Sequence, residues 1–141
     1  MKEFYKDPIA RVYYDSKLDT LFLEYTAKVP NEEKFIVINT AVLEAFCTLS
    51  TQKFVADIRK MGIISVGSQQ WVLKNLLPGM LKHLNGKKLF HAQFLDPSEV
   101  LSKVSANNIK SKSSEVATDF EVRQFSDTGE MREYLMSCLN S

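Results

Sequence analysis

Residues 54–71, FVADIRKMGIISVGSQQW, constrain the fold of this chain more than any other stretch. Residues 54–58 are apolar apart from Asp57, which is typical of a short strand buried in the interior of a sheet. A short turn follows, and Ser65 can cap a helix that runs through about Leu84. A strand that leads directly into a helix predicts a parallel crossover connection, which is almost always right-handed. We therefore expect helices to cover the sheet that this strand enters.

The remaining patterns predict four more strands and three more helices. Strands are expected at residues 9–14 and 20–26, joined as an antiparallel hairpin, and at 89–95 and 120–125. Helices are expected after Asn31, Asp96 and Asp127, each of which precedes an amphipathic pattern. The order β-β-α-β-α-β-α-β-α predicts an α/β fold: a single domain over residues 1–141, with a mixed five-stranded sheet and helices packed on it.

Pro78 lies inside the helix that is expected to begin at Ser65. Proline lacks a backbone donor and clashes with the preceding turn, so we expect this helix to kink or break near Leu77. Trp71 shares a helical face with Val72 and Leu76, which is more typical of a core residue than of a ligand platform. The kink could still open an apolar pocket beside Trp71.

Composition and charge exclude several classes of function. The chain has 141 residues, enough for one full core, and a formal net charge of +1, so it has no strong field to recruit nucleic acid. No apolar run reaches the roughly 18–20 residues of a membrane span, and the first residues lack a signal-peptide pattern. Cys47 and Cys138 fall in predicted helices, so we expect buried free thiols in a cytoplasmic protein.

Asp57 and Arg59 follow the central strand, and ligands of open α/β sheets usually bind at this carboxyl end. The helix start at Ser65 and Ser68 could receive an anion there through its free amides. An acidic ligand held by Arg59 and these amides is therefore one interpretation. The alternative is that Asp57 and Arg59 pair locally and that Ser65 is only a helix cap.

No catalytic constellation accompanies these residues. His83 and His91 have no partner at metal-ligand spacing, so we expect no metal site. The chain contains neither a G-x-S-x-G nucleophile elbow nor a glycine-rich phosphate loop. We therefore predict a protein that is not an enzyme, with no catalytic residues and no cofactor.

With its elements placed, the chain resembles the small bacterial SpoIIAA-like proteins of the STAS type, whose fold is related to CRAL-TRIO lipid-transfer domains. The resemblance covers nearly the whole chain, residues 1–141, and implies one SpoIIAA-like domain. The features that it rests on are the N-terminal hairpin, the helix opening VPNEEKF, the strand at 55–59, the turn at 61–65 with Trp71 six residues later, and Phe125-Ser126-Asp127 before the last helix.

Better-known STAS proteins are partners in regulation by phosphorylation and accept phosphate on a serine in the loop after the corresponding strand. The resemblance makes Ser65 and Ser68 the candidates here. Those proteins carry an acidic residue, a serine, a serine or threonine and a glycine in this loop. The chain departs from that pattern, because no acidic residue precedes either serine in ISVGS.

Two functions follow from these observations; an enzyme that uses Asp57, Arg59 and the nearby serines is a third hypothesis, disfavoured because none of these residues is paired with an evident base. The first is a non-catalytic regulatory or protein-interaction module of STAS type, with a protein partner bound near residues 60–68. The alternative is a carrier or sensor of an apolar, lipid-like small molecule in a pocket near Trp71 and the kink at Pro78. Phe4, Tyr5 and Tyr13 near an edge hairpin also predict a homodimer.

Overall fold

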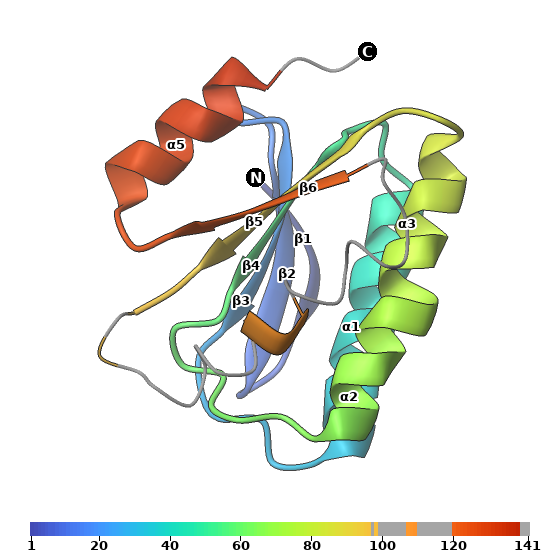
Figure 1. The fold of residues 1–141 in the computed structure, drawn as a ribbon, viewed down its shortest axis with the longest axis vertical. Coiled ribbons are helices and arrows are strands. Elements are labelled where there is room, and N and C mark those ends of the chain that lie inside the picture. Colours follow the sequence, from blue (N-terminus) through green and yellow to red (C-terminus); the bar gives the residue numbers. More distant parts are fainter. Residues whose placement is uncertain (97, 99–106, 110–119, 139–141) are drawn as a thin grey trace.

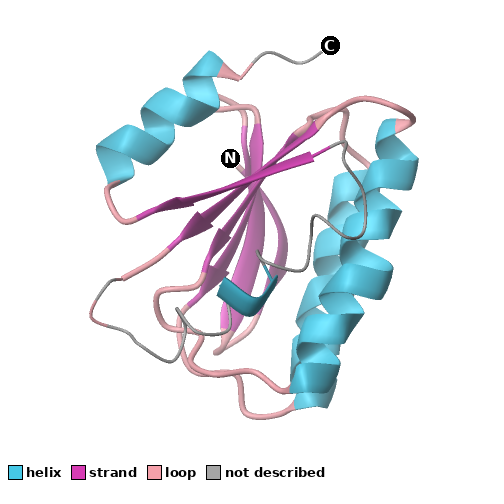
Figure 2. Cartoon of the chain, viewed as in Figure 1, coloured by secondary structure: helices cyan, strands magenta, loops and turns pink. Residues whose placement is uncertain are grey.

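The structure, a computed structural model, describes residues 1–96, 98, 107–109 and 120–138. These residues form an α/β fold with one mixed sheet of six strands, in the order β1-β2-β3-β4-β5-β6 (Figures 1 and 2). The strands are β1 (Lys2–Lys6), β2 (Ala10–Asp15), β3 (Thr20–Tyr25), β4 (Lys53–Asp57), β5 (Leu89–Phe94) and β6 (Phe120–Phe125). The helical segments are α1 (Glu32–Cys47), α2 (Val66–Trp71), the π-helical turn η1 (Val72–Leu76), α3 (Leu77–Leu84) and α5 (Thr128–Ser137).

The sixth strand, β1, corrects the five-stranded sheet expected from the sequence. It pairs antiparallel with β2, and its register shifts between Glu3 and Tyr5, which marks a bulge. Because of this bulge the consecutive residues Phe4 and Tyr5 both pack against the main core. The strand therefore lacks the alternation of apolar and polar residues by which a half-buried strand is usually found.

Strand β4 lies in the interior of the sheet, as predicted. It pairs in parallel with β3 on one side and with β5 on the other, so that Ala56 lies between Leu23 and Gln93. Its residues are all buried. After a short turn the chain enters α2, whose cap is Ser65. The connection from strand to helix that the sequence predicts is confirmed.

The helices form two layers of unequal size. Strands β3 to β6 are neighbours in sequence order, so each connection between them leads to the next strand in the same direction along the sheet. When such connections share the same handedness, their helices lie on the same face of the sheet. Figure 1 shows α1, α2 and α3 together on that face and α5 alone on the other. The main core lies under α1 to α3, and a smaller core around Phe22, Val55 and Leu135 lies under α5.

Side-chain caps fix where the helices begin. Asn31 Oδ1 accepts from the Lys34 amide at 2.8 Å, and Asp127 Oδ2 accepts from the Glu130 amide at 2.8 Å. Both caps are as predicted. The carboxyl end of α5 is held differently: the buried Lys53 of β4 donates from Nζ to the Leu135 carbonyl at 2.7 Å. A buried lysine thus ties α5 to the centre of the sheet.

Pro78 does not break its helix. The α2, η1 and α3 segments follow one another without interruption from residue 66 to residue 84. Within η1 the hydrogen bonds lengthen by one residue, and the Leu77 amide donates to the Val72 carbonyl. Pro78 enters at the start of α3, next to this wider turn, where its missing N–H and its ring are accommodated.

Some sequence predictions fall outside the described residues or need correction. The helix expected after Asp96 would lie mostly at residues 99–106, which are outside the described residues. Both cysteines are free thiols, but only Cys138 is buried; Cys47 lies at the last position of α1 and is exposed. Within the described parts of the chain, no helix has the length and apolar character needed to cross a membrane.

Candidate functional site

Asp57 and Arg59 form a closed ion pair at the carboxyl end of β4. Arg59 donates from Nε to Asp57 Oδ1 at 2.9 Å and from Nη2 to Oδ2 at 2.7 Å. These hydrogen bonds raise the pKa of Arg59. The guanidinium carbon also lies 4.4 Å from the centre of the Phe94 ring. The sequence left local pairing open as an alternative, and this is the arrangement that the structure has.

A polar hollow of about 180 Å³ surrounds this pair at the ends of β3 and β4. Glu24, which also lines it, accepts from Arg11 Nε at 2.5 Å. Asp96 accepts from the amide and hydroxyl of Ser98, and these bonds lower the pKa of Asp96. The carboxylates of the hollow are thus held by neighbouring donors. Among the described residues there is no group of His, Cys, Asp and Glu that could hold a metal ion.

Ser65 and Ser68 lie at the amino end of α2, with different surroundings. Ser65 is exposed, and its Oγ accepts from the Ser68 amide at 3.0 Å and donates to Glu32 Oε1 at 2.7 Å. Ser68 is 1% exposed. The Glu32 carboxylate lies over Gly67, where an added Cβ would collide with Oε1. The chain therefore brings its own carboxylate to the expected anion site, and an incoming anion would have to displace Glu32.

Trp71 is the last residue of α2 and is half-buried against the main core. The π-helical turn η1 follows it directly, and Val72 and Leu76 of this turn line a small cavity between the sheet and the helical layer. Trp71 itself does not line this cavity. The sequence thus points to the right stretch of helix for a cavity, but not to the residues that face it.

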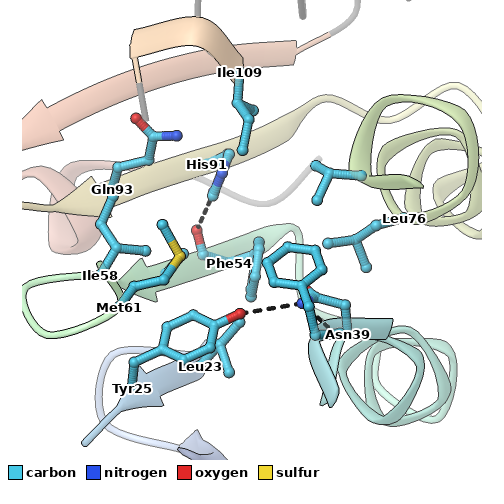
Figure 3. A pocket seen from close by; sticks show the side chains of 13 residues that line it. Leu23, Tyr25, Asn39, Phe54, Ile58, Met61, Leu76, His91, Gln93 and Ile109 are labelled. Atoms are coloured by element: carbon cyan, nitrogen blue, oxygen red, sulfur yellow. Dashed lines mark hydrogen bonds between the residues drawn. The ribbon is translucent and has the colours of Figure 1, made fainter. Parts of the chain in front are cut away.

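This inter-layer cavity has a volume of about 40 Å³ and contains an unusual set of polar groups. Tyr25 of β3, Asn39 of α1, and His91 and Gln93 of β5 line it together with apolar side chains (Figure 3). All four residues are buried. Sequence reasoning missed this group, because its members are far apart in the chain. The signal that could have found it is the presence of His91 and Gln93 inside an otherwise apolar strand.

The inter-layer cavity buries polar side chains, whereas the turn at residues 61–66 exposes apolar ones. Ile63 is 58% exposed and Val66 is 65% exposed, and they stand on either side of the exposed Ser65. Gly62 has φ +76°, a conformation that favours glycine. The Val29 amide donates to the Met61 carbonyl at 3.2 Å and ties the turn to the loop after β3. The turn therefore presents two β-branched side chains on a tethered backbone.

A groove between β1 and α1 is a second place with accessible apolar side chains. It is lined by Phe4 and Tyr5 of β1 and by a stripe of α1 that includes Val37 and Ala41. Tyr13, predicted to act with Phe4 and Tyr5 in a dimer, stacks instead on Phe22 at 5.2 Å. That pair belongs to the smaller core under α5, on the other face of the sheet.

Comparison with known proteins identified no relative of this chain. No family model matches the chain, and no curated protein or solved structure matches it. The resemblance to STAS proteins therefore stays a prediction from the sequence.

Proposed function

We propose that this protein is a non-catalytic protein-interaction module of STAS type that binds its partner through the turn at residues 61–66. The observation that supports this proposal is the exposure of Ile63 and Val66 beside Ser65. Large apolar residues grouped on the surface mark interaction sites, and Ile63 and Val66 are three positions apart on one tethered turn. The same turn lies where the sequence predicts a partner, near residues 60–68.

The polar groups nearby favour binding over catalysis. Asp57 is paired with Arg59, and Glu24 with Arg11. A general base or nucleophile needs a free position within reach of a substrate. Because these side chains are engaged with one another, we place the protein among modules that are not enzymes. We propose a cytoplasmic location, because Cys47 and Cys138 are free thiols, as is usual in a reducing compartment.

A regulatory version of this function uses Ser65. It is exposed at the centre of the turn, whereas Ser68 is buried. A phosphate on Ser65 would bring close to two negative charges to an oxygen that now donates to Glu32 at 2.7 Å. The repulsion would expel Glu32 and change the shape of the turn. Ser65→Glu should therefore alter partner binding, and unchanged affinity for that variant would exclude the switch while leaving the interaction surface in place.

Site-specific photo-crosslinking in cells that make the protein tests the proposed surface. A photoreactive phenylalanine is placed at Ile63 or Val66 and, as matched controls, at Val37 or Met136, which are 51% and 70% exposed. We expect one discrete crosslinked partner protein from positions 63 and 66 and none from Met136, while position 37 should give at most a crosslink between two copies of this chain. Equal crosslinking from all four positions, or none from 63 and 66, would contradict the proposal.

The second candidate, a carrier of an apolar molecule, is the weaker one. The inter-layer cavity lies beside η1, as that function requires, but its 40 Å³ is far below the roughly 300–1,000 Å³ of pockets that bury drug-sized ligands. Four polar side chains in its wall also disfavour a lipid-like guest. Native mass spectrometry of gently purified protein tests this function, because a retained apolar ligand would support the carrier over the interaction module.

A homodimer remains a prediction for the β1–α1 groove. Phe4 and Tyr5 line this groove as expected, and Val37 is its most exposed large apolar residue. Sedimentation velocity of the wild type and of Val37→Glu tests it. A dimer that the substitution dissociates would confirm the prediction, and a wild-type monomer would refute it.

A further inference from the structure

The inter-layer cavity contains hydrogen-bonding groups that have no partner among the residues that the structure describes. At its β3 side, Asn39 donates from Nδ2 to Tyr25 Oη at 3.1 Å and to the Phe35 carbonyl at 2.9 Å (Figure 3). Both hydrogens of the Asn39 amide are thus committed. The Tyr25 hydroxyl hydrogen and Asn39 Oδ1 have no partner among the described residues. One donor and one acceptor are left at this side.

A second pair is left at the β5 side. The Phe54 carbonyl lies 3.1 Å from His91 Nδ1 and can only accept, so Nδ1 carries the proton and the lone pair of Nε2 has no partner in the described part of the chain. Gln93 Oε1 accepts from Gln124 Nε2 at 3.0 Å, which leaves the Gln93 amide hydrogens without a partner among the described residues. This side therefore also offers one acceptor and one donor group.

These unused groups face space and are not sealed in the protein. Within the described part of the chain, every buried side-chain nitrogen or oxygen that is closed to a water-sized probe has a hydrogen-bond partner. Tyr25, Asn39, His91 and Gln93 are at most 3% exposed, so the space that Asn39 Oδ1, His91 Nε2 and Gln93 Nε2 face is the cavity that they line. Tyr25, whose Oη accepts from Asn39 Nδ2, lines the same cavity. Buried polar groups in such a space are usually satisfied by ordered water.

The size and charge of the cavity define its occupant. At roughly 10–15 Å³ for each water molecule, 40 Å³ holds about three. Strands β3 and β5 flank β4, so their side chains start about 10 Å apart, too far for one water to bridge. Among the described residues that line the cavity, none carries a permanent charge, and burial lowers the pKa of His91 to about 4, which keeps its ring neutral at neutral pH.

We propose that the inter-layer cavity is a built site for water, occupied by a chain of two or three molecules that runs over β4 from Tyr25 and Asn39 to His91 and Gln93. The occupant is neutral and must both donate and accept, as water does. An apolar gas atom or a charged ion does not match these groups. The site is independent of the partner turn and stands whether or not that turn binds a protein.

A high-resolution crystal structure of the whole chain, with and without xenon pressure, tests this site. We expect ordered water within hydrogen-bond distance of Tyr25 Oη and His91 Nε2, and no xenon in the cavity. A cavity that is empty without xenon or filled by xenon would overturn the proposal, because dry apolar cavities behave in that way.

A pair of matched variants tests the proposed contacts. Tyr25→Phe removes only the hydroxyl, so the water bound to Tyr25 Oη should move toward the Asn39 amide, which this substitution leaves with a free donor and acceptor, while the water at His91 remains. Tyr13→Phe, on the other face of the sheet, should leave the chain of waters unchanged. Water magnetic relaxation dispersion on wild type and Gln93→Leu gives the same test in solution, as a loss of long-lived water in the variant. An unchanged signal in Gln93→Leu would contradict the proposed contacts.

Discussion

Acid should destabilise this protein through one buried histidine. His91 is 3% exposed, and its ring stacks on Phe54 with 4.9 Å between ring centres. Burial disfavours the charged ring and lowers the pKa of His91 from 6.5 to about 4, although the hydrogen bond to the Phe54 carbonyl acts in the opposite direction. The folded protein therefore keeps a neutral imidazole at pH values where the unfolded chain binds a proton.

The sign and size of the effect follow from this difference. Since the unfolded state binds more protons between pH 6.5 and about 4, the free energy of unfolding falls as the pH drops through this window. With these two pKa values, the loss between about pH 7 and about pH 5 is roughly 2 kcal/mol, and it approaches about 3 kcal/mol near pH 4. Well below the folded pKa, His91 adds little further loss, because both states then bind the proton.

Urea denaturation of the wild type and of His91→Gln at about pH 7 and about pH 5 measures this contribution. Glutamine keeps a donor for the Phe54 carbonyl but does not titrate. The wild type should lose about 2 kcal/mol more than the variant between the two pH values, because the other titrating groups are common to both. Equal losses in the two proteins, or an NMR titration that places the pKa of His91 in the folded state near 6.5, would refute the reasoning.

Two further predictions concern packing. Lys53→Met removes the donor to the Leu135 carbonyl, so amide hydrogen exchange in α5 should speed up by roughly tenfold, the equivalent of about 1–2 kcal/mol. Strands β4 and β5 should stay protected, and faster exchange throughout the chain would contradict this role of Lys53. Gly79→Ala would place a Cβ 2.8 Å from Leu43 Cδ1, and despite better helix propensity it should destabilise the protein by about 1 kcal/mol in urea denaturation. In a Leu43→Ala background the same change should stabilise it, and the same sign in both backgrounds would contradict the packing explanation.

The sequence predicts local features of this fold well. The caps Asn31, Ser65 and Asp127 and the strand at 120–125 lie where their patterns place them. Each depends on side chains within a few residues of one another, which a single sequence contains. Strand β1 was not predicted, because its bulge turns two consecutive aromatic residues toward the same core and so removes the alternation of apolar and polar residues.

The site was harder to predict, because it depends on contacts between distant segments. The sequence places Asp57 and Arg59 at the end of a strand, but it cannot show that they bind each other in preference to a ligand. It identifies the amino end of α2 as an anion site, but Glu32, 33 residues earlier than Ser65, reaches that end in the folded chain. Tyr25, His91 and Gln93 line the same cavity only because the sheet places β3 and β5 on either side of β4.

The affinity of the partner recovered by crosslinking measures the central claim most directly. Full burial of an Ile or Val side chain is worth about 1.5–3 kcal/mol, and Ile63 and Val66 are 58% and 65% exposed, so each should contribute about 1 kcal/mol to binding. The double variant Ile63→Ser, Val66→Ser should therefore raise Kd by about 30-fold, and the matched variant Val37→Ser, Met136→Ser should leave it unchanged. An unchanged Kd in the first variant, or an equal loss in both, would contradict the assignment of the 61–66 turn as the partner surface.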